Sequence, residues 1–467
     1  MVSTSTHSAS SFSAPLPSTA DTCIVGAGPS GLAVALGLAV REIPFVIVDA
    51  LEAGHNGSRA IGVFPNALEA LNTVSRELVD DIMAAGIIST STTCLDAHGK
   101  TLMNFRFDAA LDARTEFPFY VIIQQHRVEA LMRAYLARMG TNIHWGKRVT
   151  SLRAVNDGTL YALQLASGET LEAKYVVAAD GAKSALREAA GIRYLDPHTG
   201  ADAIFEGKDD WRLFVVADVV FDPPAPSSIP RDRVQSTIGR GGLVMTAPIP
   251  GEEGEEEEDE ITRLYLGVPG SPPPADPDAA YLQSLVDAHG APAPSPPSKP
   301  KIARVLDSAR YRVAVALAER YLARATADAG AASAYILLAG DAAHRQGPAG
   351  GQGMNLGICE GLALAEAICA ARMCALTTAN RHPESEFAIF NEYATRRREI
   401  AREVMGMVRN MTALEDCGSG LVDYLRMKVV SALCGVELVE KRMVWRVSEE
   451  GVDNIVSHGC CVGHCPG

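Results

Sequence analysis

Gly340-Asp341-Ala342-Ala343-His344, continued by Pro348-Ala349-Gly350-Gly351-Gln352-Gly353-Met354-Asn355, is the stretch of sequence that decides the fold. An apolar run at 335–338 precedes it and predicts a strand, and an Ala-, Leu- and Glu-rich run over 355–371 predicts a helix. The acid of the first pentapeptide then lies past the carboxyl end of a strand, where ligands bind in open α/β sheets. A Gly-Asp pair after a strand is more often an ordinary turn. A long glycine loop that opens onto a helix N-terminus favours a phosphate-containing ligand instead.

A second glycine signature, Gly26-Ala27-Gly28-Pro29-Ser30-Gly31, lies far upstream. The apolar run 22–25 precedes it, an Ala-rich helical pattern follows over 32–40, and a β-type run at 44–48 ends on Asp49. This order of strand, glycine turn, helix and strand indicates a dinucleotide-binding unit. A glycine turn in some other α/β protein is the alternative, and the acid after the second strand disfavours it.

Each residue of the upstream signature has a physical role in such a unit. Gly26 permits the tight turn, Gly28 lets the backbone approach a pyrophosphate, and Gly31 lets helix and strand pack closely. The carboxylate of Asp49 can accept hydrogen bonds from an adenosine ribose.

With these motifs in place, the chain resembles the class A flavoprotein aromatic hydroxylases, of the p-hydroxybenzoate and phenol hydroxylase type. The resemblance covers most of the chain from about residue 20 to 375 and weakens in the middle. It is carried by four blocks: the upstream glycine signature, Ser58-Arg59-Ala60 with Gly62, the segment 175–184 with its Asp180-Gly181 pair, and the stretch from Gly340 to Asn355. Two positions depart from the family pattern, with Ala178 in place of glycine and Glu360 in place of aspartate.

The resemblance implies FAD as the cofactor. The cofactor-binding residues that it implies are Gly26, Gly28, Gly31, Asp49, Arg59, Gly62, Arg127, Asp180, Asp341, Gly353, Met354 and Asn355. Asp341 is expected on the ribityl–pyrophosphate portion, Arg59 near the flavin or pyrophosphate, and the main chain at 353–354 against the isoalloxazine. For Arg127, a solvated arginine at a helix start remains the alternative.

The family also implies a reaction. NADPH or NADH reduces the flavin, and O2 then supplies one oxygen atom to an aromatic or otherwise electron-rich small molecule, as in specialised metabolism. Because the cofactor carries this chemistry, the sequence identifies no catalytic side chain. An FAD-dependent oxidase or dehydrogenase on the same fold, or a flavin-binding protein that has lost activity, are the alternatives.

The expected fold is α/β, with a Rossmann-like FAD-binding domain, a mixed β-sheet substrate domain and a C-terminal helical extension. The boundaries are a disordered leader at 1–20, the discontinuous FAD-binding domain at 21–190 plus 331–383, the substrate domain at 191–330 with disordered loops at 251–260 and 269–300, the helical region at 384–450 and a tail at 451–467. Arg212, Arg240 and Tyr265 are candidates for contacting an acidic or phenolic substrate, although residues of this kind more often only face a strand.

Composition narrows the class of partner. The net charge of −14 argues against nucleic acid, and eight acids between 252 and 260 predict a solvated loop. No apolar run is expected to span a membrane. Ten scattered cysteines suit a reducing compartment, so we expect a cytoplasmic monomer or homodimer. The Cys- and His-containing tail is interpreted as disordered rather than as a zinc site, and no metal is expected.

Overall fold

The computed structural model describes residues 15–54, 60–111, 114–203, 213–223, 228–239, 242–251, 260–267, 273–292, 299–312, 314–325, 333–347, 349–377 and 383–415.

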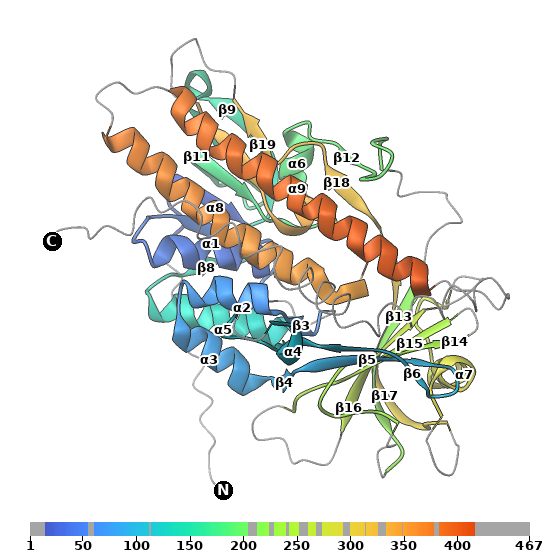
Figure 1. Cartoon of the computed structure of the whole chain (residues 1–467). Coiled ribbons are helices and arrows are strands. Elements are labelled where there is room, and N and C mark those ends of the chain that lie inside the picture. Colours follow the sequence, from blue (N-terminus) through green and yellow to red (C-terminus); the bar gives the residue numbers. More distant parts are fainter. Residues whose placement is uncertain are drawn as a thin grey trace, which may run out of the picture.

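An eight-stranded sheet joins segments from distant parts of the chain (Figure 1). Its main strand order is β19-β20-β11-β1-β2-β8, and β10 and β9 extend it from β11. The strands are β1 (Thr19–Val25), β2 (Val46–Val48), β8 (Ile143–His144), β9 (Val149–Val155), β10 (Leu160–Leu165), β11 (Thr170–Ala178), β19 (Leu322–Arg324) and β20 (Tyr335–Leu338). In its centre β1 pairs in parallel with β2 and β11, and β11 pairs in parallel with β20. The two glycine signatures therefore follow strands of one sheet.

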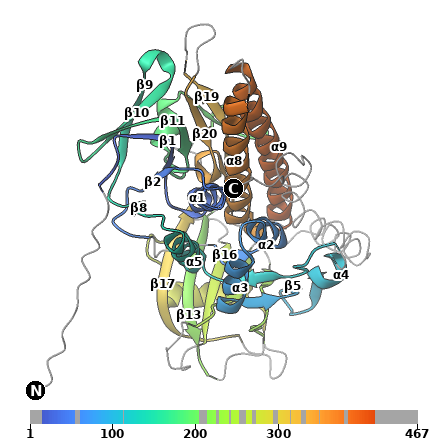
Figure 2. The same ribbon diagram turned by 90° about the vertical axis from the view of Figure 1, so that its left-hand side faces the viewer.

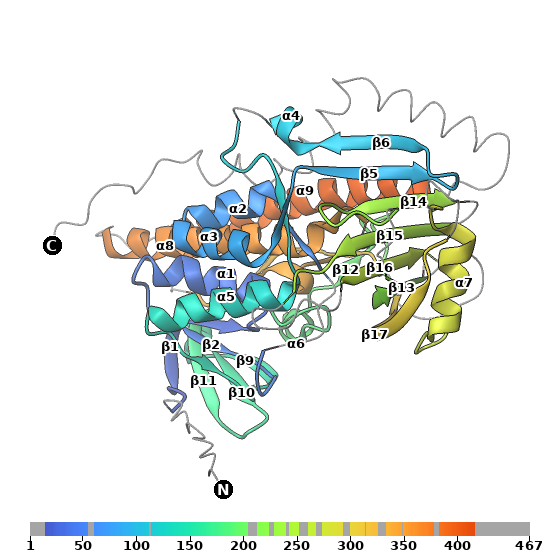
Figure 3. The ribbon, with the colours of Figure 1, turned by 90° about the horizontal axis from the view of Figure 1, so that it is seen from below.

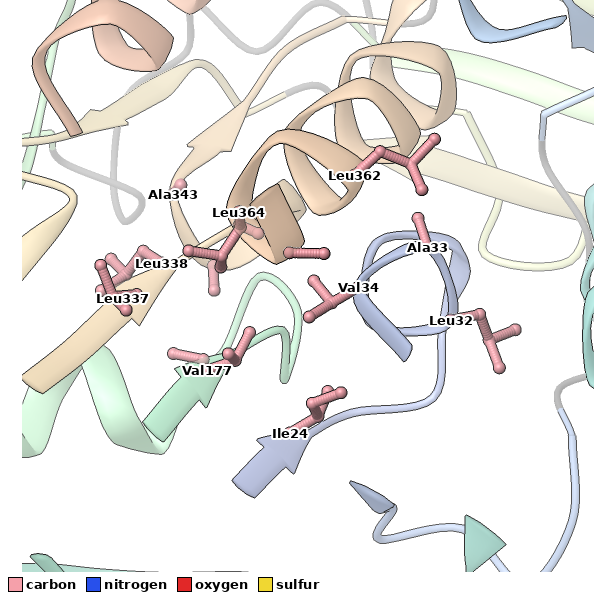
Figure 4. Close-up of a cluster of buried hydrophobic side chains, with 14 of the residues drawn as sticks. Ile24, Leu32, Ala33, Val34, Val177, Leu337, Leu338, Ala343, Leu362 and Leu364 are labelled. Atoms are coloured by element: carbon pink, nitrogen blue, oxygen red, sulfur yellow. The ribbon is translucent and has the colours of Figure 1, made fainter. Parts of the chain in front are cut away.

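Helices cover this sheet, and Figure 2 shows α8 and α9 packed side by side along it. The helices of this part are α1 (Pro29–Ala39), α2 (Pro65–Asn72), α3 (Arg76–Ala85), α5 (Gln125–Arg138), α8 (Gln352–Thr377) and α9 (Pro383–Glu415). Small residues let α1 and α8 cross closely, since a Cβ added at Gly37 would lie 2.5 Å from that of Ala365. Leu362 and Leu364 of α8 complete the core (Figure 4).

Helix α8 is apolar because other helices cover it. Its Gln352–Ala375 portion reaches the length and mean hydropathy of a membrane span, which the sequence analysis overlooked, but 72% of the window is buried inside the protein. Its composition is that of a core helix packed between α1 and α9.

A second sheet of seven strands has the order β17-β13-β16-β15-β14-β5-β6. The strands are β5 (Ser91–Asp96), β6 (Thr101–Arg106), β13 (Leu213–Phe221), β14 (Gln235–Gly239), β15 (Gly242–Pro248), β16 (Ile261–Gly267) and β17 (Ile302–Arg312). Helix α7 (Ala279–His289) packs on its outer face through Leu282, Leu285 and Val286 (Figure 3). The expectation of a disordered loop over 269–300 is therefore wrong for this part, because these apolar side chains bury the helix against the sheet. The strands β5 and β6 come from the N-terminal part of the chain, a contribution that the sequence analysis did not foresee.

Two three-stranded sheets and two short helices connect these parts. They comprise β3 (Gly62–Val63), β7 (Tyr120–Ile122) and β4 (Ile87–Ser89) in one sheet, β12 (Tyr194–Leu195), β18 (Ala316–Ala318) and β21 (His344–Arg345) in the other, and the helices α4 (Phe107–Leu111) and α6 (Ala185–Ala189). The expected mixed α/β fold is confirmed.

The C-terminal helix α9 runs along the molecule and is fixed by polar contacts (Figure 1). The Lys174 ammonium lies 2.7 Å from the Glu386 carboxylate, and the Tyr393 hydroxyl donates to the carbonyl of Leu338 at 3.0 Å. The rest of the predicted helical region after residue 415, most of the leader, the tail, the acidic segment 252–259, and Arg212 and Arg240 lie outside the described residues.

Candidate active site

One cavity of about 1080 Å³ connects the two large sheets. Its lining includes both glycine signatures and the inner face of the seven-stranded sheet. A site for a single small ligand typically occupies about 300–1,000 Å³. The cavity is therefore large enough for a dinucleotide at one end and part of a second molecule at the other.

The upstream glycine turn separates two kinds of glycine. A Cβ added at Gly31 would lie 1.9 Å from the carbonyl oxygen of Gly26, and one at Gly26, where φ is +106°, would lie 2.1 Å from that of Ala179. At Gly28, by contrast, an added Cβ would meet no described protein atom within 4 Å. Gly28 also precedes α1 without any side-chain cap, so the first N–H groups of the helix are left for a ligand.

Asp49 holds this turn in place. One carboxylate oxygen accepts from the backbone N–H of Ala27 at 2.7 Å, and the other accepts from that of Leu51 at 2.8 Å. Each carboxylate oxygen has a second lone pair, so Asp49, which lines the cavity, can also accept from a ribose hydroxyl.

The downstream loop needs glycine at two positions, because φ is +79° at Gly350 and +61° at Gly351. Asn355 holds the loop through side-chain hydrogen bonds. Its amide nitrogen donates to the carbonyls of Gly62 and Gly351, both at 2.9 Å. Its side-chain oxygen accepts from the N–H of Phe64 at 2.8 Å. The side chain of Asn355 thus joins the second and fourth sequence blocks and does not itself line the cavity.

A buried ion pair supports the turn that contains Asp341. Glu360 accepts from the N–H of Gly340 at 2.8 Å, and the same oxygen lies 2.9 Å from Nε2 of His344. Burial disfavours the charged imidazole, but the neighbouring Glu360 carboxylate outweighs burial and raises the pKa of His344 above its usual value. Sequence reasoning missed this pair, although the Gly-Asp-Ala-Ala-His pentapeptide contained the histidine.

Asp180 carries an unused acceptor. One carboxylate oxygen accepts from the N–H of Leu186 at 3.2 Å, and the other is buried without a partner in the part of the chain that the structure describes. Burial raises the pKa of this carboxyl group. Next to it a Cβ added at Gly181 would again meet no described atom within 4 Å. An open glycine beside an unpaired acceptor fits a dinucleotide with hydroxyl groups.

The other end of the cavity has aromatic and apolar walls. Phe64 and Tyr120 stack with ring centroids 5.4 Å apart, and Phe107 lies 5.1 Å from Tyr120. All three line the cavity. We call Phe64, Phe107 and Tyr120 the aromatic triad. A Cβ added at Gly351 would lie 3.0 Å from the ring of Phe64, so the aromatic triad lies directly against the downstream glycine loop.

Tyr265 lies on the inner face of the seven-stranded sheet and lines the cavity, in agreement with its selection as a candidate. Two positions before it on the same strand, Arg263 makes two hydrogen bonds of 2.7 Å to Asp218. Burial raises the pKa of Tyr265, so its hydroxyl stays protonated near neutral pH. It can donate a hydrogen bond and is not poised to act as a base.

The structure brings together most of the residues that the sequence selected. Those that line the cavity are Gly26, Gly28, Asp49, Gly62, Asp180, Asp341, Gly353 and Met354. Gly31 and Asn355 lie behind the lining, and Arg59 is outside the described residues. Arg127 donates instead to the carbonyls of Pro250 and Gly251, at 3.2 and 3.1 Å. The sequence missed the aromatic triad, whose members are scattered over 64–120 without a motif.

Comparisons with known proteins identify the family of the chain. A family model described as FAD binding domain matches residues 19–406. The 6-methylpretetramide 4-monooxygenase of Streptomyces rimosus is 26% identical, covering 93% of this chain and 69% of that protein. The structure of p-nitrophenol 4-monooxygenase from Pseudomonas putida DLL-E4 covers 92% of this chain and 99% of that one, with a TM-score of 0.71 at 20% identity.

A Diels-Alderase of the pyrroindomycin biosynthetic pathway is also similar, with a TM-score of 0.69 at 22% identity, covering 92% of this chain and 80% of that one. Structures at these identities share the fold, which by itself does not fix the reaction. The family model spans most of the chain, and open glycines and an unpaired buried acceptor fit the cofactor. The chain therefore belongs to the FAD binding domain family and is an FAD-dependent monooxygenase, as its resemblance to the class A hydroxylases implied.

Proposed function

We propose that this chain hydroxylates an electron-rich aromatic small molecule in specialised metabolism, with NADPH or NADH as electron donor and O2 as oxygen donor. The observation that carries the proposal is the single cavity that joins the glycine signatures to the aromatic triad. When bound, FAD supplies the redox chemistry and the activation of O2.

The residues of this chain then have separable tasks. The β1–α1–β2 unit would hold the ADP half of FAD in the Rossmann manner, with Gly28 at the pyrophosphate and Asp49 at the ribose. Asp341 and the main chain at Gly353 and Met354 would border the ribityl chain and ring, and Asp180 would accept from a hydroxyl group. Arg59 and Gly62 stay in the proposed set as contacts from the flavin side, whereas Arg127, which donates to the carbonyls of Pro250 and Gly251, does not.

At the other end, the protein positions the aromatic ring and excludes water. The aromatic triad offers faces and edges for ring contacts, and the apolar strand faces remove solvent from the reacting carbon. Tyr265 offers a hydrogen-bond donor. The relative that acts on 6-methylpretetramide supports an aromatic substrate for this chain too.

The cellular location, the oligomeric state and the domain boundaries are also part of the proposal. The ten scattered cysteines of the sequence suit a reducing compartment, and on this ground we propose a cytoplasmic location. We propose a monomer or homodimer. We keep the domain boundaries expected from the sequence, except that β5 and β6 belong to the second sheet, β19 belongs to the first, and α7 lies within 269–300.

The deciding experiment follows oxygen from labelled O2. Purified holoenzyme is incubated with labelled O2, NADPH or NADH, and each of a panel of phenols and polyketide-like aromatics. The masses of the products are then measured by mass spectrometry. A substrate should accelerate flavin reduction and gain one labelled oxygen atom. If the label appears only in hydrogen peroxide while the substrate loses two hydrogens, the protein is an oxidase. If no compound stimulates NAD(P)H oxidation, the hydroxylase proposal is wrong.

A further inference from the structure

The inner face of the seven-stranded sheet presents its side chains in register. One row crosses five neighbouring strands, because each residue pairs with the next: Cys94, Ser236, Met245, Tyr265 and Val216. All five line the cavity. Neighbouring strands lie about 4.8 Å apart, so the row from Cys94 to Tyr265 is about 14 Å long. We call these five residues the floor row.

Ser236 differs from the other polar side chains around it. It is partly exposed, and its hydroxyl has no hydrogen-bond partner among the residues that the structure describes. On the opposite face of β14, Gln235 donates to the carbonyl of Ser228 at 2.7 Å. Thr92, which lies on the cavity face of β5 two residues before Cys94, donates its hydroxyl to the carbonyl of Val234 at 3.0 Å. Among these side chains, the hydroxyl of Ser236 is the one left for a ligand.

The chain segment of Ser236 contacts the aromatic triad through Val234. Two residues earlier, Val234 lines the cavity, and its N–H donates to the Tyr120 hydroxyl at 3.1 Å. Side chains two positions apart share a face of a strand. Between Ser236 and Tyr265 stands Met245, an apolar and adaptable side chain. The result is an apolar strip with a hydroxyl near each end and aromatic rings along one side.

We propose that Ser236 determines specificity by hydrogen bonding to an oxygen substituent of an aromatic substrate whose rings lie along the floor row. The length of the row and its two hydroxyls, on Ser236 and Tyr265, match a substrate with more than one ring and oxygen functions toward both ends. This inference deepens the proposed function and rests on it for the identity of the ligand as a substrate.

The test measures binding rather than turnover. Holoenzyme with oxidised FAD is titrated with 2-naphthol and with naphthalene, and the flavin absorbance reports binding without NAD(P)H. The wild type should bind 2-naphthol about fivefold more tightly, as expected for one neutral hydrogen bond. Ser236→Ala should bring the ratio of the two dissociation constants to about one, and Ser236→Thr, which keeps a hydroxyl, should preserve the preference.

Thr92→Val is the matched control, because it removes a cavity hydroxyl that already has a protein partner, the carbonyl of Val234. It should leave the ratio unchanged, and all variants should keep the FAD affinity and melting temperature of the wild type. A wild type without preference or without binding of either probe, an equal loss in Thr92→Val, or release of FAD from Ser236→Ala would each overturn the inference. Failure of the proposed function is scored separately, since it would leave this binding ratio intact while the oxygen-labelling experiment failed.

Discussion

The two ends of the cavity differ in the groups that line them. The proposed cofactor end contains the glycines at strand ends and helix starts, whereas the proposed substrate end contains side chains on alternating strand positions. A main-chain site depends on a few positions that tolerate one residue type, so it leaves a motif in the sequence. A side-chain site depends on sheet register, which brings together residues from five strands and leaves no local motif.

The largest effect is expected at Gly31, where packing within the protein requires glycine. The added Cβ of Gly31→Ala would stand 1.9 Å from backbone at Gly26. We expect a loss of roughly 3 kcal/mol or more in the free energy of unfolding, as for severe overpacking. Denaturant unfolding of the apoprotein measures it; an unchanged midpoint would contradict the close packing of the turn.

Asn355→Ala is expected next, because it severs the link between the Gly62 and Gly351 segments. It removes three hydrogen bonds inside the protein. We expect about 2–4 kcal/mol lower stability and partial loss of FAD on gel filtration. A stable variant that still loses its flavin would instead make Asn355 a direct cofactor contact.

Gly28→Ala sharpens the comparison with Gly31, since it changes the ligand side of the same turn. Its backbone has φ −77° and ψ −177°, which alanine adopts freely. The apoprotein should keep its stability, while the dissociation constant of FAD should rise by roughly tenfold or more, because a methyl group stands where the pyrophosphate approaches. Fluorescence titration of apoprotein with FAD decides it, and equal FAD affinity would move the pyrophosphate elsewhere.

A smaller effect is expected from pH. The pKa of His344 is raised in the folded protein, so the stability that its protonation contributes is full below the unfolded pKa of about 6.5. It is lost as the pH rises through the higher folded value. The melting temperature of the wild type should therefore fall as the pH rises from the unfolded to the folded pKa of His344. In Glu360→Gln, the melting temperature should change less over the same pH range. A wild-type profile with the opposite slope would mean that His344 is neutral in the folded protein.

The sequence predicted the strands before the two glycine signatures, because such main-chain turns leave a local motif. Strand β20 coincides with its prediction at 335–338, and β1 contains the apolar run at 22–25. Register is a tertiary property, so no pattern in the chain announced that Ser236 would stand between Cys94 and Met245. The contribution of β5 and β6 to the second sheet was missed because both strands lie between helices assigned to the first. Arg127 was selected by resemblance, and its guanidinium reaches toward β15 instead.

The packing of α1 against α8 also imposes an order of events during protein synthesis. Helix α1 is buried from Gly31 to Leu38, and much of its cover comes from α8, which begins more than three hundred residues later. While the ribosome translates the intervening chain, the nascent N-terminal segment has an apolar helix without that cover. Domains that fold as they emerge avoid such exposure, whereas this one must wait for its C-terminal part. We therefore expect the nascent chain to expose apolar surface to chaperones, and the proposed FAD site to be complete only after α8 has left the exit tunnel.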